Sequence, residues 1–258
     1  MKSLIRKGAA ALTAGGIIVG SIISAGLSAI ALTSEEVTQQ LRHVPVFTVT
    51  DETGSPLVSE VSEEDDIPPV TQVFISKADA DAFIDGLSEA NPELASSVRV
   101  TAVSLGRIYE VALQGQEDDS RLEFVFVPQQ SQVQSAVTII QEASESDQTV
   151  DEFSGVPLFT ARTVNEGSDD FGYLTIQQGE QEVVPMFFRS EDLQSLLSEI
   201  SENQPELAST LEEHVIRLED LIYTFETSDN EDLQQIRLVP SSETLRYIQE
   251  QISEEEGQ

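Results

Sequence analysis

The chain contains the same series of short motifs twice, and this duplication limits its possible folds more than any other feature. Five landmarks recur in the same order, with the members of each pair 112 to 114 residues apart. Chance similarity does not keep so constant an offset, and two copies are too few for a solenoid, which needs about three. We therefore expect two tandem, pseudo-symmetric copies, with binding surfaces present twice or along the seam. The pairs are 44–48 with 156–160, 73–75 with 186–188, 91–96 with 204–209, 108–109 with 222–223, and 127–128 with 239–240.

The hydrophobic pattern of each copy predicts strand, strand, helix, strand, helix, strand and helix. This order favours an α+β fold in which helices pack on a mixed or antiparallel sheet. Thr33 and Glu36 match a capping box and predict a helix over 34–42. Ser76 is predicted to cap the helix that follows it, and that helix and its counterpart in the second copy carry one apolar face. The face consists of Ala80, Phe83, Ile84 and Leu87 in the first copy, and of Leu193, Leu196, Leu197 and Ile200 in the second.

The predicted organisation is a cleavable signal peptide over 1–31, a first half over 32–142, a linker over 143–154 and a second half over 155–258. The leader has three basic residues, 24 uncharged positions and the sequence AIA before the expected cut. The uncharged stretch could also span a bilayer as a retained anchor. Cleavage is favoured because glycine and alanine dilute its hydrophobicity and no basic stop-transfer residues follow. We expect the halves to form one globular domain, soluble and outside the cytoplasm.

The charge of the chain is extreme, with 47 Asp and Glu against 13 Lys and Arg and a formal net charge of −34. Such a surface repels phosphate backbones and anionic head groups, so we expect no binding to nucleic acid or membranes through charge. The acidity serves solubility, which a saline environment would require, or attracts basic clients, and the sequence leaves both open. There is no cysteine, which excludes disulfides and thiol chemistry.

This charge predicts that salt stabilises the protein. Mobile ions screen repulsion between like charges on the surface of the folded chain. The melting temperature should therefore rise between low and moderate salt, measured by circular dichroism. A melting temperature that fell over this range would contradict the prediction.

We find no motif typical of catalysis: no nucleophile elbow, phosphate-binding loop or dinucleotide fingerprint occurs. His43 and His214 lack the spacing of a metal site, and both are interpreted as ordinary exposed side chains, with His214 in a predicted helix. The acidic runs 63–66 and 117–119 lack the ligand spacing and central glycine of a calcium loop. We expect neither an enzyme, a cofactor nor a metal; an exported hydrolase is a distant alternative.

Aromatic residues recur in the paired strands and are the candidate client-binding residues. Core packing is the ordinary role for such side chains. The segment 184–188 (VPMFF), however, is apolar on both faces of its strand. One face should meet the core helix, and the other must meet either the opposite copy or an open apolar groove that binds a client. The candidates are Phe47, Phe74, Phe159, Met186, Phe187 and Phe188.

The ordered set of these motifs resembles a known family. The motifs are 44–48 (VPVFT), 73–76 (VFIS) before 78–80 (ADA), 91–94 (NPEL), 103–105 (VSL), 126–128 (FVP), 155–159 (GVPLF) and 185–188 (PMFF). Together they are similar to the Tic twenty-two-kilodalton family, the soluble intermembrane-space components of the chloroplast import apparatus and their cyanobacterial periplasmic relatives. The resemblance covers the chain from Leu41 to Ile252.

The resemblance implies a pseudo-symmetric α+β globule with apolar pockets on its two sides and no catalytic residues. It implies a chaperone-like escort in a cyanobacterial-type periplasm that binds unfolded outer-membrane proteins or preproteins without ATP. The implied partner is an Omp-type outer-membrane insertase, with no stable membrane insertion after signal cleavage. The alternative is a scaffold that bridges membrane assembly complexes without touching clients.

Overall fold

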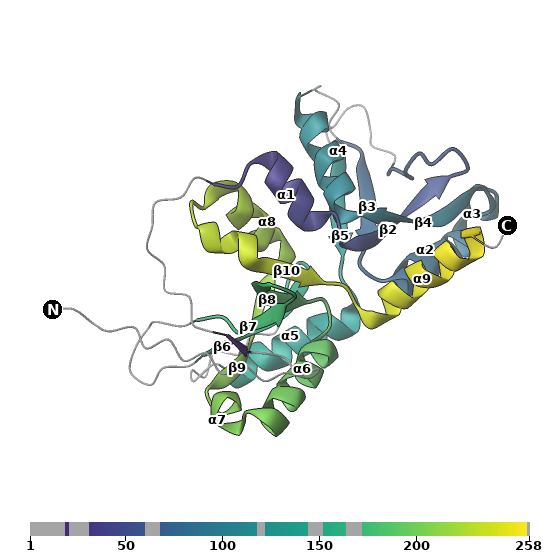
Figure 1. The fold of residues 1–258 in the computed structure, drawn as a ribbon. Helices are drawn as coiled ribbons and strands as arrows, with labels where there is room; N and C mark the ends of the chain where they lie inside the picture. The colour runs from purple at the N-terminus through teal and green to yellow at the C-terminus, as the bar shows by residue number, and fades with distance from the viewer. Residues whose placement is uncertain are drawn as a thin grey trace.

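The computed structural model describes residues 19–20, 31–59, 68–117, 122–143, 152–163 and 172–256 (Figure 1). Most of the predicted signal peptide and linker, and the polar loop over 60–67, lie outside these residues. The first elements are β1 (Val19–Gly20), α1 (Ser34–Leu41), β2 (Pro45–Asp51), β3 (Val70–Phe74), α2 (Lys77–Ala90), α3 (Pro92–Ser97), β4 (Val98–Ser104), α4 (Leu105–Glu117), β5 (Glu123–Val127) and α5 (Gln130–Ala143). The others are β6 (Pro157–Thr163), β7 (Thr175–Gln178), β8 (Gln181–Phe187), α6 (Ser190–Asn203), α7 (Pro205–Ala208), β9 (Leu211–Arg217), α8 (Leu218–Thr227), the 3₁₀ helix η1 (Glu231–Gln235), β10 (Ile236–Val239) and α9 (Ser242–Glu256).

The strands form two mixed sheets, which confirms the prediction of an α+β fold. The first sheet has the order β4-β2-β3-β5. The second has the order β1-β7-β8-β6-β9, with β10 paired to β8. In the first sheet β2 pairs antiparallel with β3 and β4, and β5 adds in parallel to β3; in the second sheet β6 pairs antiparallel with β8 and β9, and β10 adds in parallel to β8.

The two sheets share their strand pairings and nearly the same register. β2 pairs with β4 over seven residues, as β6 does with β9. The contact Phe47↔Phe74 corresponds to Phe159↔Phe187. The parallel pair Phe74↔Val127 corresponds to Phe187↔Val239. The landmarks around the paired strands therefore occupy equivalent places in the two sheets.

One landmark pair was aligned wrongly from the sequence. The Leu105 N–H donates to the Val44 carbonyl at 2.7 Å, and the Leu218 N–H donates to the Val156 carbonyl at 2.9 Å. These bonds place α4 and α8 in register at an offset of 113 residues, from 105 to 218, whereas the Ile-Tyr landmark required 114. The structural counterpart of Tyr109 is consequently Ile222. The Ile-Tyr motifs at 108–109 and 222–223 are identical in sequence, but they lie one residue apart in position when the two helices are aligned at their first residues.

A central core joins the two halves. Val46 and Val73 of the first half pack in one cluster with Leu158 and Met186 of the second. Helices α1, α4 and α8 contribute to the same cluster through Val37, Leu41, Leu105, Leu218 and Phe225. At the contact between α1 and α4, an added Cβ at Gly106 would lie 2.7 Å from the Thr38 carbonyl oxygen. A glycine at this position allows the two backbones to approach closely.

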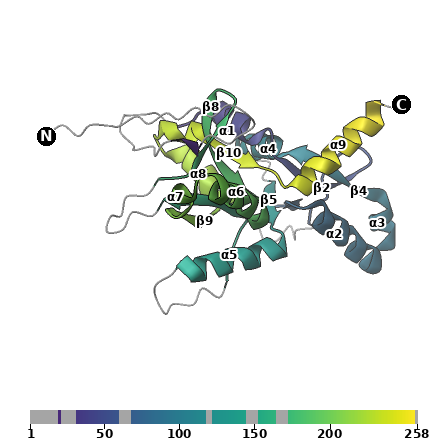
Figure 2. The same cartoon turned by 60° about the horizontal axis from the view of Figure 1, so that its bottom comes forward.

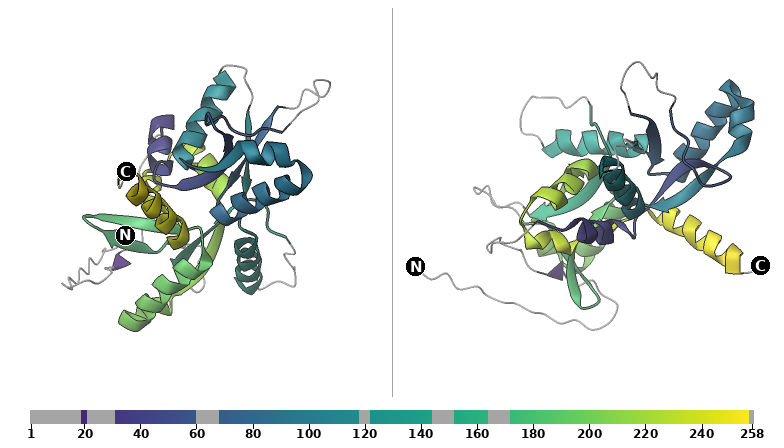
Figure 3. Two further views of the ribbon diagram at one scale, coloured as in Figure 1. Left: turned by 90° about the vertical axis from the view of Figure 1, so that its right-hand side faces the viewer. Right: turned by 90° about the horizontal axis from the view of Figure 1, so that it is seen from above.

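The last helix of each half crosses to the other half. Ala136 and Ile139 of α5 pack in a cluster with Phe159 and Leu193, on the outer face of the second sheet. Tyr247 of α9 instead packs on the first sheet, with its ring 5.7 Å from that of Phe47. Figures 1 and 2 show α5 beside α6 and β9, and Figure 2 shows α9 next to the first sheet at β2. In the right panel of Figure 3, α9 runs away from the second half toward the side of α2 and α3. The hydrophobic pattern had predicted both helices but not this exchange.

Most local predictions agree with the structure. The capping box is present, because the Thr33 N–H donates to Glu36 Oε2 at 2.9 Å and the Glu36 N–H donates to Thr33 Oγ1 at 3.3 Å. Ser76 is the residue before α2, but its side chain makes no capping hydrogen bond. The strand predicted as the fourth element of each copy is present as β4 in the first half and as β9 in the second. None of the described helices is both long and apolar enough to cross a bilayer.

Candidate functional site

The six residues predicted to bind clients are all buried. Their exposed fractions lie between 0% and 8% for Phe47, Phe74, Phe159, Met186, Phe187 and Phe188. The second face of the 184–188 segment meets the first half, because Val184, Met186 and Phe188 belong to the central core. Direct contact between these side chains and clients stays a prediction. It requires that an element covering them be displaced.

An apolar groove lies elsewhere in the first half, between α4 and β5. This α4–β5 groove has a volume of about 670 Å³. Its lining is mostly aliphatic and aromatic, which is typical of sites that bind apolar ligands. The lining residues are Leu105, Ile108, Tyr109, Ala112, Leu113, Gly115, Leu122, Glu123, Phe124 and Phe126 of the first half, with Ile222 and Glu226 of α8.

The equivalent space in the second half contains large side chains. At the register offset of 113, Ala112 of α4 corresponds to Phe225 of α8. Phe225 is fully buried in the central core, together with Leu233 from η1. Alanine at this position in the first half leaves room that a phenyl ring fills in the second. The groove therefore depends on one small residue.

One wall of the groove is an outer strand of the first sheet. β5 pairs with β3 through the odd-numbered residues: the Glu123 N–H donates to the Pro69 carbonyl, and the Val127 carbonyl accepts from Ile75. In a parallel ladder the intervening residues direct their backbone groups the other way. Phe124 and Phe126 thus present backbone donors and acceptors at the edge of β5 that pairs with none of the described strands, beside the groove that their side chains line.

A hydrogen bond fixes the rim of the groove. The Tyr109 hydroxyl donates to Glu226 Oε1 at 2.9 Å. Burial and this carboxylate raise the pKa of Tyr109 to about 12, so the hydroxyl remains a donor at neutral pH. Glu123 and Glu226 give the rim a negative charge. The groove thus offers apolar contact inside and acidic groups at its edge.

The lining residues of the α4–β5 groove belong to ordinary amphipathic patterns, so the groove is not recognisable from the sequence. The available signal was the difference between Ala112 and Phe225. That difference becomes visible only when the copies are aligned at an offset of 113. The landmark offset of 114 paired Ala112 with Glu226 instead.

A second unusual arrangement lies where α2 and α6 begin. Asp79 and Asp192, at equivalent positions of the two helices, each have a buried Oδ2 without a hydrogen-bond partner among the described residues. Burial raises the pKa of both carboxyl groups, and Glu243 raises that of Asp79 further. Each ionised carboxylate therefore lacks part of the solvation that water would supply.

The raised pKa predicts how Asp79→Asn changes stability with pH. A carboxyl whose pKa is higher in the folded state binds protons more tightly when folded, so stability is lost as pH rises through the folded pKa. The variant cannot ionise, so its free energy of unfolding should rise relative to that of the natural protein as the pH rises above about 4, the ordinary pKa of Asp, by about 1 kcal/mol at most for a half-exposed group. Urea unfolding at several pH values measures this difference. Asp85→Asn, an exposed change on the same helix, is the control; an equal effect there would contradict the prediction.

The two histidines occupy different surroundings. His43 is exposed, as predicted, but His214 is half-buried in the strand β9, so its prediction as an exposed helical residue is wrong. Burial and the nearby Arg162 lower the pKa of His214, and its ring lies 6.1 Å from that of Tyr173. Within the described part of the chain, no group of three or more His, Cys, Asp or Glu could hold a metal ion. The acidic run 63–66 and residues 118–119 of the second run lie outside it.

The chain is similar in sequence to two chloroplast proteins that carry nearly the same name. The chain is 23% identical over 214 residues to the chloroplastic protein TIC 22-like of Arabidopsis thaliana, covering 81% of this chain and 61% of that protein. It is 22% identical to the chloroplastic protein TIC 22 of Pisum sativum, covering 87% of this chain and 81% of that protein. The chain thus spans less than two thirds of the length of the Arabidopsis relative.

Solved structures agree with this relationship. The structure of Anabaena Tic22, described as a protein of protein transport, matches with a TM-score of 0.72 and 30% identity, covering 84% of this chain and 97% of the other. Tic22 from Plasmodium falciparum has the same fold, with a TM-score of 0.60 and 22% identity over 82% of this chain and 95% of that one. The model of the Tic22-like family matches residues 14–251, nearly the whole chain. This chain belongs to the Tic22-like family.

Proposed function

We propose that this protein is a holdase or escort in protein transport, which binds unfolded clients in the α4–β5 groove. The groove is the observation that carries the proposal, since an apolar hollow of about 670 Å³ stands open beside a sheet edge. An extended client segment can pair with the backbone of Phe124 and Phe126 while its side chains enter the groove. Such strand addition combines main-chain hydrogen bonds with side-chain pockets.

The charge pattern suits this role. Acidic groups at the rim favour client segments in which basic residues flank apolar ones. The net charge of −34 keeps protein and client complexes apart by repulsion. Binding is passive, without ATP, cofactor or catalysis, since the sequence has no nucleotide-binding motif.

We place this activity in a cyanobacterial-type periplasm, where clients are unfolded or partly folded outer-membrane proteins and preproteins. Cleavage of the leader releases the protein, which delivers clients to an Omp-type insertase for outer-membrane biogenesis. Support comes from the basic and apolar leader sequence and from the Anabaena relative described as a protein of protein transport. The matched strand pairings of the two sheets support a duplicated ancestral unit, whose copies are related by a pseudo-two-fold axis.

The test is suppression of aggregation. A urea-unfolded outer-membrane β-barrel is diluted into buffer with and without the purified protein, and light scattering is followed. We expect scattering to fall as the protein approaches molar excess, and crosslinks to form between the client and β5. Unchanged scattering at molar excess, with no crosslink, would reject the holdase proposal.

A bridging scaffold is the second candidate, favoured by the high density of surface acids. A scaffold would bind its membrane partners through these acids and would leave aggregation unchanged. Neutralising rim acids, with Glu123→Gln as the first variant, should weaken a scaffold contact. If the protein is a holdase, Glu123→Gln should weaken binding of basic clients and leave binding of uncharged clients unchanged.

A further inference from the structure

The wall of the α4–β5 groove is rich in aromatic rings. Tyr109, Phe124 and Phe126 line it, three of only 15 aromatic residues in the chain (11 Phe and 4 Tyr). Phe124 and Phe126 pack against the central core but are only half-buried, so part of each ring remains exposed. Aromatic rings attract one another beyond the effect of the area that they bury. The wall therefore favours a ring over an aliphatic side chain.

The second half shows which side chain fits this space. Phe225 stands where the first half has Ala112, and it is fully buried. Ile236 of β10 is the counterpart of Phe124 of β5, and it packs in the same cluster as Phe225. The fold thus holds a phenyl ring between this helix and this strand. In the first half, where the helix supplies alanine, a ligand can supply the ring.

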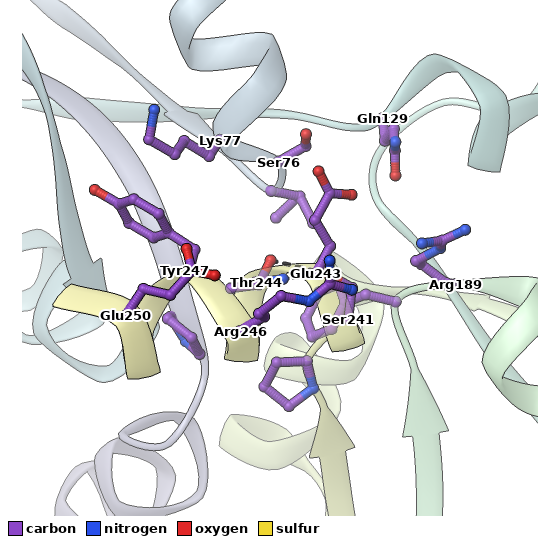
Figure 4. A pocket seen from close by; sticks show the side chains of 14 residues that line it. Ser76, Lys77, Gln129, Arg189, Ser241, Glu243, Thr244, Arg246, Tyr247 and Glu250 are labelled. Atoms are coloured by element: carbon purple, nitrogen blue, oxygen red, sulfur yellow. Dashed lines mark hydrogen bonds between the residues drawn. The ribbon is translucent and has the colours of Figure 1, made fainter. Parts of the chain in front are cut away.

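The hollow where the two halves meet has a different chemistry (Figure 4). Its volume is about 240 Å³, and five of the side chains that line it are charged: Lys77, Arg189, Glu243, Arg246 and Glu250. Lys77 is paired with Asp81 at 2.6 Å, and Arg189 with Glu191 at 3.3 Å. An apolar ring placed there would remove water from charged groups, which costs free energy. A client segment that carries a ring should therefore bind in the α4–β5 groove.

The alternation of a strand determines what lies next to the ring. Successive side chains point to opposite faces, so a segment paired with β5 places every second side chain in the groove. The side chains between them lie on the face of Glu123 and Val125. Both of these residues are exposed. A basic residue next to the ring can therefore pair with the Glu123 carboxylate across the strands.

We propose that the α4–β5 groove selects extended client segments in which an aromatic residue stands next to a basic one. The ring enters the space beside Ala112 and packs against Phe124 and Phe126, and the basic side chain pairs with Glu123. The space that remains takes apolar side chains two positions away from the ring. This inference rests on the proposed function of the groove and names the class of segment that it takes.

The test uses three nine-residue peptides that differ only in the central residue, which is phenylalanine, leucine or alanine. Each has arginine on both sides of the centre, valine at the next position outward, and blocked ends. Attraction by the acidic surface is then the same for all three. Binding to the purified protein is measured by calorimetry at constant ionic strength.

We expect the phenylalanine peptide to bind about fivefold more tightly than the leucine peptide. It should bind at least about tenfold more tightly than the alanine peptide. Equal affinity for the phenylalanine and leucine peptides would overturn the proposal, as would no binding of the phenylalanine peptide at millimolar concentration.

Two matched variants locate the ring. Phe124→Leu keeps the wall apolar but removes one of its rings, and it should bring the phenylalanine and leucine peptides to within about twofold of each other. Phe83→Leu makes the same change at a half-buried position on the opposite face of the first sheet and should leave the preference unchanged. Urea unfolding shows that both variants are folded. A preference that persists in Phe124→Leu, or that is lost equally in both variants, contradicts the assigned site.

Glu123→Gln tests the basic neighbour. Replacing both arginines of the phenylalanine peptide by glutamine should weaken its binding to the natural protein about threefold more than its binding to this variant. An equal loss in the two proteins would mean that net charge alone attracts the arginines, and pairing with Glu123 would be wrong.

The light-scattering test of the holdase is separate from these measurements. Binding of all three peptides without preference would overturn the selectivity and leave the holdase proposal standing. A preference for the phenylalanine peptide together with unchanged light scattering would reject the holdase and keep the selectivity.

Discussion

Phe225→Ala should lower the free energy of unfolding by about 3–5 kcal/mol, the range for a large aromatic residue truncated in a core. Phe225 is fully buried, and it packs in the central core that joins the two halves. Its removal costs the transfer free energy of the ring and leaves a cavity that the surrounding helices fill only partly. Because the same cluster contains Val46 and Leu158, the loss should weaken both halves together.

Urea unfolding followed by circular dichroism measures this effect. Tyr223→Ala, on the same helix, is the matched control because Tyr223 is 66% exposed. It should change the free energy of unfolding by less than about 0.5 kcal/mol, as exposed substitutions usually do. A separate early transition in the Phe225→Ala variant would mean that the halves unfold independently, contrary to a shared core. A loss as small as that of the control would contradict the assigned burial.

The sequence predicts helices well where burial is one-sided. In α6 the apolar positions recur at helical spacing because Leu193, Leu196 and Ile200 all face the second sheet. The strand pattern of β9 is less clear for the converse reason: six of its seven residues are half-buried, and Glu212 and Glu213 interrupt any alternation. Its strand conformation is set by seven pairs with β6, a tertiary interaction that local pattern does not contain.

The exchange of α5 and α9 between halves is also tertiary information. The pattern of Ala136 and Ile139 shows that one face of α5 is buried, but either sheet would satisfy that requirement. The same limit applied to the aromatic candidates, since Phe159 and Phe187 were identified as strand residues without knowledge of which helix covers them. Their full burial followed from packing between halves.

The α4–β5 groove was unpredictable for a different reason, because it is defined by a side chain that is small. Ala112 belongs to no distinctive sequence pattern, because alanine is common in helices. A groove that exists because a large side chain is missing can be recognised only by comparison with an equivalent position that has one. Here that position is Phe225, the counterpart of Ala112. The comparison also provides the means of testing function without disturbing the core.

Ala112→Phe should abolish most client binding while leaving the fold intact. A phenyl ring at this position repeats what Phe225 does in the second half, and the groove of about 670 Å³ has room for it. Filling the groove removes the apolar surface that a client side chain would cover. We expect the concentration needed for half-maximal suppression of aggregation to rise at least about tenfold. This corresponds to a loss of about 1.4 kcal/mol of binding free energy. The free energy of unfolding should stay within about 1 kcal/mol or rise, because the ring fills existing space.

Ala90→Phe is the matched control, since it adds the same ring at an exposed position at the end of α2. This variant should suppress aggregation as the natural protein does. Both variants are compared in the light-scattering assay, and their unfolding by urea is recorded in parallel. An Ala112→Phe protein that is stable yet fully active would exclude the α4–β5 groove as the client site. Activity would then have to come from surfaces that the structure keeps closed, such as those around Phe159 and Phe188.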